Sequence, residues 1–183
     1  MVHTGVYQRP VTGIGQVRAL AILSPLLRRA YRDADLQRVL LSDEVASHEL
    51  DNNLLVIGGP KTNAVAKELL DRLAPRLPFT VAGNVITWDK TSYDGPAADD
   101  VVLHDFGYVV RAAHPLHPDR RVVIVAGSHT FGTAAAARWL ADNGGSFHLP
   151  ADVAVLLEAD VSMKQHIATG TVLHQVALKA ASR

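Results

Sequence analysis

The chain has 183 residues, 48% hydrophobic and 20% charged, which suits one domain with a substantial core and excludes wholesale disorder. Eighteen basic residues balance eighteen acidic ones, so charge gives no reason to expect nucleic acid or an anionic membrane as the main partner. The absence of cysteine excludes disulfides, thiolate metal sites and cysteine nucleophiles.

We predict a single α/β domain over residues 1–183 that is located in the cytoplasm. No apolar run approaches the ~20 residues that span a bilayer. The N-terminus also lacks the basic region and apolar core of a signal peptide. Residues 1–12 have no clear periodicity and contain Pro10, so we expect an irregular N-terminal arm there.

The turn Gly13-Ile14-Gly15 precedes a predicted helix that Pro25 kinks or divides. Large apolar residues recur at helical spacing, and they predict the buried face. That face consists of Val17, Leu20, Ala21, Leu23, Leu27 and Tyr31. Residues 35–41 are then expected to form a short strand, and residues 44–50 a brief helix.

Residues 54–63, with the sequence LLVIGGPKTN, combine an apolar strand with a glycine turn. A helix follows, because apolar residues recur at helical spacing from Val65 to Leu73. Residues 121–140, RVVIVAGSHTFGTAAAARWL, repeat the order strand, glycine loop, helix. Apolar strands followed by helices are typical of a parallel sheet that is buried on both faces. We therefore predict a Rossmann-like three-layer α/β sandwich with a mainly parallel central sheet.

The region 79–112 has a different pattern, which predicts an antiparallel excursion from the parallel sheet. Gly83-Asn84 lies between two β-rich runs and indicates a hairpin. Residues 101–113 are expected to form two short strands, broken near residues 105–107. A strand is predicted at 153–157, and residues 169–177 are predicted to form a last strand at an edge of the sheet.

Glycine-rich turns before helices gather free backbone N–H groups, and such groups can bind an anion. We expect the two glycine loops to form a cradle for a nucleotide-like or otherwise phosphorylated ligand, with Gln16 and Arg18 as a third wall. The predicted loop residues are Gly58, Gly59, Lys61, Thr62, Asn63, Gly127, Ser128, His129, Thr130, Gly132 and Thr133. The same glycines also suit tight turns, and Thr62 or Asn63 can simply cap a helix. No P-loop and no complete GxGxxG motif is present.

Acidic residues at predicted strand ends are the candidates for acid–base chemistry. They are Asp43, Glu44, Asp105, Glu158 and Asp160. Glu158 follows an apolar strand, so we expect a buried carboxylate with a raised pKa and assign it the catalytic role if the protein is an enzyme. Capping or ion pairing explains each acid equally well. His114 and His117 are spaced like metal ligands, but prolines flank them and no other ligand motif accompanies them, so we predict no metal site.

The two loop motifs, Gly58-Gly59-Pro60 with Asn63 and then Val123 to Leu140, carry a resemblance to known domains. They resemble uncharacterised actinobacterial Rossmann-like domains and a domain associated with archaeal S-layer proteins. The resemblance implies an α/β fold with a ligand-binding or assembly role, and it transfers no catalytic residue.

Two functions remain open from the sequence. In the first, the protein binds a small nucleotide-like ligand, with no cofactor identified, and acts as a nucleotide hydrolase or glycosyl transferase. In the second, it is a non-enzymatic module that forms homo-dimers or joins a larger assembly. The neutral charge and the edge strand at 169–177 favour the second function.

Overall fold

The computed structural model describes residues 12–30, 39–95, 97–98, 101–102, 104–146, 149–159 and 170–179. The expected irregular arm at 1–12 lies almost entirely outside this part of the chain. The helices are α1 (Ile14–Ala30), α2 (Ala64–Leu73) and α3 (Thr130–Asn143), with short 3-10 turns η1 (Ser47–Glu49) and η2 (Ala74–Arg76). The strands are β1 (Leu54–Ile57), β2 (Phe79–Ala82), β3 (Val85–Trp88), β4 (Thr91–Tyr93), β5 (Ala97–Ala98), β6 (Val101–Val102), β7 (Asp105–Ala113), β8 (Arg121–Gly127), β9 (Val153–Ala159) and β10 (Gly170–Ala177).

Five strands form the main sheet in the order β1-β8-β7-β9-β10. Only β1 and β8 pair in parallel, whereas β7 pairs antiparallel with both β8 and β9, and β10 pairs antiparallel with β9. The strands β2, β3 and β4 form a separate three-stranded sheet. The prediction of a mainly parallel Rossmann-like sandwich is therefore wrong, and the protein is a mixed α/β structure.

The error arises at β7. The sequence predicts two short strands outside the main sheet, yet residues 105–113 form one nine-residue strand between β8 and β9. Residues Gly107 to Val110 are all buried, because other elements cover both faces of the sheet. Burial on both faces produces the continuous apolar run that is typical of parallel strands, but here the strand is antiparallel.

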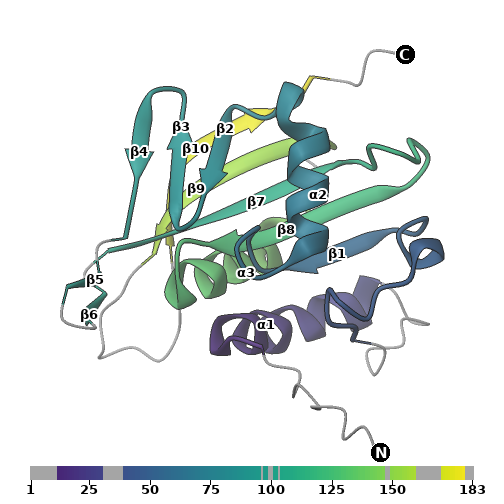
Figure 1. Ribbon diagram of the computed structural model, residues 1–183, viewed down its shortest axis with the longest axis horizontal. Coiled ribbons are helices and arrows are strands. Elements are labelled where there is room, and N and C mark those ends of the chain that lie inside the picture. Colours follow the sequence, from purple (N-terminus) through teal and green to yellow (C-terminus); the bar gives the residue numbers. More distant parts are fainter. Residues whose placement is uncertain are drawn as a thin grey trace, which may run out of the picture.

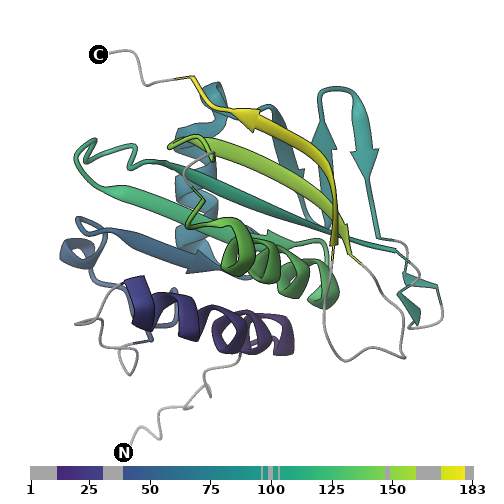
Figure 2. The same ribbon diagram turned by 180° about the vertical axis from the view of Figure 1, so that it is seen from behind.

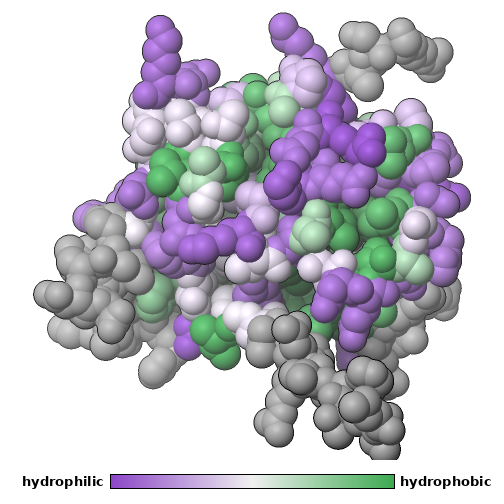
Figure 3. All heavy atoms as spheres, viewed as in Figure 1, coloured by the Kyte–Doolittle hydropathy of each residue, from purple (hydrophilic) through white to green (hydrophobic). Residues whose placement is uncertain are grey.

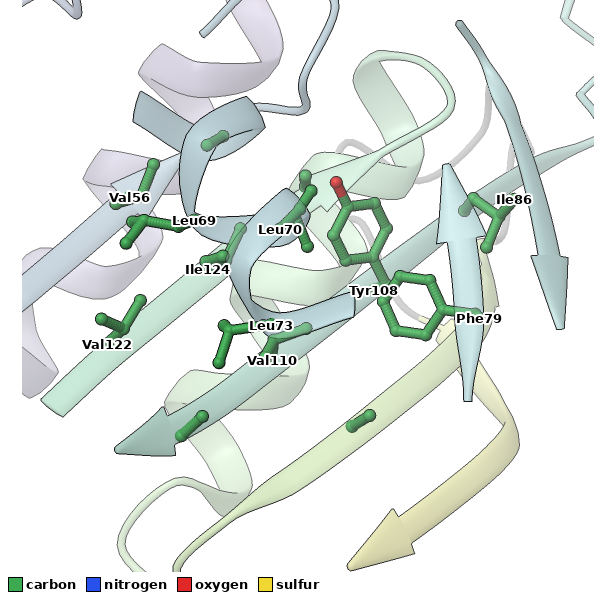
Figure 4. Close-up of a cluster of buried hydrophobic side chains, with 14 of the residues drawn as sticks. Val56, Leu69, Leu70, Leu73, Phe79, Ile86, Tyr108, Val110, Val122 and Ile124 are labelled. Atoms are coloured by element: carbon green, nitrogen blue, oxygen red, sulfur yellow. The ribbon is translucent and has the colours of Figure 1, made fainter. Parts of the chain in front are cut away.

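Two layers cover the sheet. The helix α2 and the strands β2–β4 lie on one face (Figure 1), and the helices α1 and α3 lie on the other (Figure 2). One apolar cluster joins the sheet to α2 and to Phe79 of β2, with Tyr108 beside Phe79 (Figure 4). A second cluster joins Val109, Val125 and Val155 of the sheet to α1 and α3. Alternate residues of β7, β8 and β9 thus contribute to opposite cores, as the two-residue period of a strand requires.

The buried face of α1 differs from the predicted one. The helix is continuous through Pro25, and its fully buried residues are Gly15, Ala19 and Leu23. These residues are four apart, so they form one stripe, and small side chains there let α1 approach α3 closely. Val17, which was predicted to be buried, is 48% exposed.

Several local predictions can be compared directly. The hairpin at Gly83-Asn84 is confirmed, since β2 and β3 pair across it, and the edge position of the last strand is also confirmed. The helix expected at 44–50 is reduced to the turn η1. Of the strand expected at 35–41, only residues 39–41 lie in the described chain, and they are not a strand.

A charged cluster holds the sheet end where β7 finishes. Asp152 accepts hydrogen bonds from Arg76 of η2 and from Arg121 of β8, the latter at 2.6 Å between Nη2 and Oδ1. Arg76 also donates from Nε to the Lys179 carbonyl at 2.8 Å. Burial acts to raise the pKa of Asp152, but the hydrogen bonds from Arg76 and Arg121 outweigh burial and hold it below its ordinary value. This cluster ties together segments that are far apart in sequence.

Candidate functional site

The predicted glycine turns converge at one end of the main sheet. Because β1 and β8 are parallel neighbours, both strands finish at this end, and the Gly58 N–H donates to the Val125 carbonyl at 2.9 Å. The start of α1 lies beside them, and the Gln16 amide donates to the Thr62 hydroxyl at 3.4 Å. A Cβ on Gly15 would lie 3.1 Å from the Thr130 Cα, so α1 packs directly on the start of α3. The sequence thus places these turns together correctly.

The N-terminus of α3 already holds an anion, the carboxylate of Asp105. Its Oδ1 accepts from the backbone N–H groups of His129 at 2.9 Å and Phe106 at 2.8 Å, and its Oδ2 accepts from Gly132 at 2.7 Å. Asp105 is fully buried. Burial raises its pKa, and the N–H groups of Gly132 and His129 limit the rise. The donors that the sequence assigns to a ligand therefore bind a side chain of the protein.

Backbone contacts fill the remaining space in this loop. A Cβ built on Gly132 would lie 2.1 Å from the Phe106 carbonyl oxygen, and one on Gly127 would lie 2.4 Å from the Thr133 nitrogen. Glycine is required at both positions because β7 and β8 each contact α3 through the main chain. Asp105 and the packed backbone therefore take the place of a phosphate at the α3 N-terminus, and the expected ligand cradle between the two loops stays a prediction.

The first loop also uses its polar groups within the fold. Asn63 caps α2, because its Oδ1 accepts from the Ala66 N–H at 3.0 Å and its Nδ2 donates to the Ile57 carbonyl at 3.2 Å. The Lys61 ammonium donates to Asn84 Oδ1 at 3.4 Å, which links this loop to the turn between β2 and β3. Asn63 and Lys61 therefore join β1, α2 and the hairpin.

The two glycines of this loop are expected to differ in their tolerance of a side chain. Gly58 has φ of +109°, where an L residue is strained, and its Cβ would lie 3.1 Å from the Gln16 amide nitrogen. A Cβ on Gly59 would make only ordinary contacts, the nearest being the Tyr108 hydroxyl at 3.5 Å. We expect Gly58→Ala to reduce the free energy of unfolding by about 2 kcal/mol, and Gly59→Ala to change it by less than about 1 kcal/mol. Urea unfolding of both variants measures this difference, and equal losses would contradict it.

The polar residues of the second loop serve mainly to connect elements. The His129 ring lies 2.8 Å from the Gly95 carbonyl oxygen through Nε2, and the Thr133 hydroxyl donates to the His129 carbonyl at 3.0 Å. Ser128 is buried, and its hydroxyl makes no hydrogen bond within the described residues. Thr130 is half-buried and Arg18 is exposed.

Glu158 lies at the same end of the sheet as the glycine loops, because β9 runs in the direction of β8 with β7 between them. Its side chain is 41% exposed and lies 3.1 Å from His104, between Oε1 and Nδ1, so it is not the buried carboxylate that the sequence suggested. A catalytic role for Glu158 stays a prediction. Asp160 lies outside the described residues.

The two histidines of the turn after β7 have a structural explanation. His114 is buried, and its Nδ1 accepts from the backbone N–H groups of Leu116 at 3.1 Å and His117 at 3.2 Å. His117 pairs with Asp51 at 2.9 Å. Over the described part of the chain, no group of three His, Asp or Glu side chains is arranged to hold a metal ion.

The sequence indicated the edge at the last strand but not the groove beside β1. The strand β10 forms one edge, carries no charged residue, and exposes Val172 and Val176 at 40% and 42%. At the other edge, β1 borders a groove of about 1490 Å³ that α1 and residues 39–50 flank. Hydrophobic side chains are exposed over β1 on one flank of α2 and over the β2–β3 hairpin on the other (Figure 3). Exposed edges and apolar surface of this kind are typical of interaction sites.

The fold and the surface together define a mixed α/β domain whose main sheet has open edges. The place where the two glycine loops meet, the glycine junction, is filled by Asp105 and packed backbone at the start of α3. Residues 34–143 match the S-layer like family, outer domain. Since the match covers more than half of the sequence, the chain belongs to this family, and the resemblance to the archaeal S-layer-associated domain is confirmed. No curated protein and no solved structure is similar enough to match. Among the described helices, none has the length and apolarity needed to cross a membrane.

Proposed function

We propose that this protein is a non-enzymatic assembly module whose β10 edge pairs with β10 of a second copy. The observation that carries the proposal is the character of this edge. An edge strand presents unpaired N–H and C=O groups, and proteins normally protect long edges with charges or proline. The eight residues of β10 contain neither. Its one protective feature is the register shift between Val172 and His174, which leaves His174–Ala177 as the regular run.

The β10 strand is held firmly while its outer edge stays open. His174 stacks on Trp88 of β3 with ring centroids 4.9 Å apart, and its Nε2 lies 2.6 Å from the Tyr93 hydroxyl. These contacts fix the strand from one face of the sheet, and no described strand pairs with its outer edge. A strand that is already ordered loses less conformational entropy when a second copy pairs with it. The overall charge of zero adds no net repulsion between copies.

Membership of the S-layer like family supports an assembly role, since the family is described as an outer domain. The filled glycine junction supports the non-enzymatic part of the proposal, because Asp105 takes the donors that a phosphorylated substrate would need. The partner in the proposal is a second copy of this chain.

Charges placed on β10 are expected to prevent self-association. We expect the unmodified protein to form dimers or larger species as its concentration rises, and the double variant with Val172→Lys and Val176→Lys to remain monomeric. Both valines are exposed, so the lysines disturb the edge without disturbing the core. Light scattering over a concentration series measures the mass of each protein.

Leu116→Lys is the matched control, because Leu116 is 46% exposed on the turn between β7 and β8, which β9 separates from β10. This control is expected to associate like the unmodified protein. A monomer at every concentration, or equal association of the double variant, would rule out the role of β10.

A further inference from the structure

A groove runs along the free edge of β1, at the opposite side of the sheet from β10. Its floor is β1, one wall is α1, and the other wall is the segment from Val39 to Leu50. The groove measures about 1490 Å³, which exceeds the ~300–1,000 Å³ of ordinary small-molecule pockets. All four residues of β1 line it, so an extended peptide segment could lie beside the whole strand.

The outward backbone groups of β1 are available for pairing. The Gly58 N–H bonds to β8, and the alternation of a parallel ladder then turns Leu55 and Ile57 away from β8 toward the groove. The Asn63 amide already occupies the Ile57 carbonyl. Within the described residues, no hydrogen bond reaches the N–H of Leu55, the carbonyl of Leu55 or the N–H of Ile57. Two donors and one acceptor on one side of a strand are what an added strand needs.

The walls of the groove are apolar and uncovered. Val17 on α1 is 48% exposed, and Val39 and Leu40 on the opposite wall are 54% and 39% exposed. The three side chains flank the same strand edge. An added strand presents alternate side chains to the two walls, so apolar residues at alternate positions would cover Val17 on α1, and the residues between them would face Val39 and Leu40.

The charge of the groove specifies the other side chains of its occupant. Among the described residues that line it, Asp43 and Glu44 carry carboxylates and none is lysine or arginine. In a chain with equal numbers of acidic and basic residues, this one-sided lining favours a partner that carries positive charge.

We propose that β1 receives an extended segment of another protein chain as an additional strand, with apolar side chains at alternating positions and lysine or arginine between them. Backbone hydrogen bonds to Leu55 and Ile57 hold the segment, and Val17 on α1 contacts its apolar side chains. Its basic side chains face the opposite wall, where their alkyl stems lie on Val39 and Leu40 and their charges meet the acidic residues. This site goes beyond self-association at β10 and does not depend on it, because the two edges lie on opposite sides of the sheet.

A synthetic peptide tests the proposal with the full chain. The probe is acetyl-Thr-Val-Arg-Val-Lys-Val-Thr-amide, and the matched control replaces its Arg and Lys with Glu. We expect the basic peptide to bind in isothermal titration and the acidic one to bind at least about tenfold more weakly, a difference of ~1.4 kcal/mol. Hydrogen exchange is expected to show the amides of Leu55 and Ile57 exchanging rapidly in the free protein and slowly in the complex.

Variants of exposed groove residues locate the binding. Val17→Asn and Asp43→Lys are each expected to weaken the basic peptide about tenfold, whereas Val176→Asn on the opposite edge of the sheet leaves its affinity unchanged. The double variant with Val172→Lys and Val176→Lys is expected to bind the peptide normally. A failure of the β1 proposal can therefore be distinguished from a failure of the β10 proposal. No binding of the basic peptide, equal binding of the acidic one, or equal binding by the groove variants would overturn the proposal. Slow exchange of Leu55 and Ile57 in the free protein would also overturn it, because the edge would already be covered.

Discussion

Replacing Asp105 by alanine is expected to cost the protein roughly 3–6 kcal/mol of its free energy of unfolding, the largest loss predicted for a single side chain here. The carboxylate is fully buried and accepts from three backbone N–H groups, those of Phe106, His129 and Gly132. Each buried donor left without a partner costs ~1–3 kcal/mol. Small domains have only ~5–15 kcal/mol of stability in total, so the variant is expected to be partly unfolded at room temperature.

Asp105→Asn separates the size of the side chain from its role as an acceptor. The amide oxygen can replace one carboxylate oxygen, but the NH₂ group then faces an N–H donor, so we expect an intermediate loss. Asp119→Ala, on the exposed turn before β8, is the control and is expected to change stability by less than ~0.5 kcal/mol. Urea unfolding followed by circular dichroism measures all three. A near-native midpoint for Asp105→Ala would show that water replaces the carboxylate.

Asp105 also shows why the sequence could predict the position of the glycine junction but not its content. The loops around Gly58 and Gly127 were recognised from local patterns, because a strand, a glycine turn and a helix follow one another within 20 residues or so. The anion that binds the α3 N-terminus comes from the first residue of β7, more than 20 positions earlier in the chain. No local pattern distinguishes a helix terminus that binds a ligand from one that binds a distant side chain.

The antiparallel pairing of β7 with β8 inside the main sheet, and not in a separate excursion, could have been predicted from the sequence. Only residues 114–120 connect β7 to β8, and a parallel pair needs a crossover of a dozen residues or more. The apolar run in β8 is typical of a parallel sheet, but such a run reports burial on both faces and not direction. The short connection was the decisive signal.

The face of α1 illustrates a different limit. Large apolar residues such as Val17 and Leu20 suggested the buried side. The structure buries Gly15 and Ala19 against α3 instead, together with Leu23, which was predicted correctly. Small residues give close helix contact, and the alanine-rich α3 offers a matching surface. The prediction placed large side chains on the buried side, whereas close packing of α1 on α3 places small residues there. The displaced apolar residues are the ones that now line the β1 groove.

Asp152→Asn is expected to reduce the free energy of unfolding by about 3 kcal/mol at neutral pH. The Asp152 side chain is 16% exposed and that of Arg76 13%, so this ion pair is largely shielded from water. Arg121 shares the carboxylate at 2.6 Å and is 40% exposed. Removing the negative charge leaves the guanidinium of Arg76 buried without an ionic partner, which is the costly outcome for such pairs. The loss would loosen the contacts between η2, β8 and the start of β9.

The pH dependence of this loss identifies the charge as its cause. The folded-state pKa of Asp152 lies below its ordinary value of 3.8, so folding favours the ionised form. The stability that Asp152 provides is therefore fully present above pH 3.8 and is lost as the pH falls through the folded-state pKa. We expect the gap in free energy of unfolding between the unmodified protein and Asp152→Asn to be large at about pH 7 and to shrink toward zero at about pH 2.

Asp142→Asn is the control. It removes the exposed pair between Asp142 and Arg138, whose side chains are 56% and 47% exposed, and it is expected to cost less than ~0.5 kcal/mol. Urea titrations at both pH values measure the gap, and a gap that persists unchanged at low pH would assign the loss to packing.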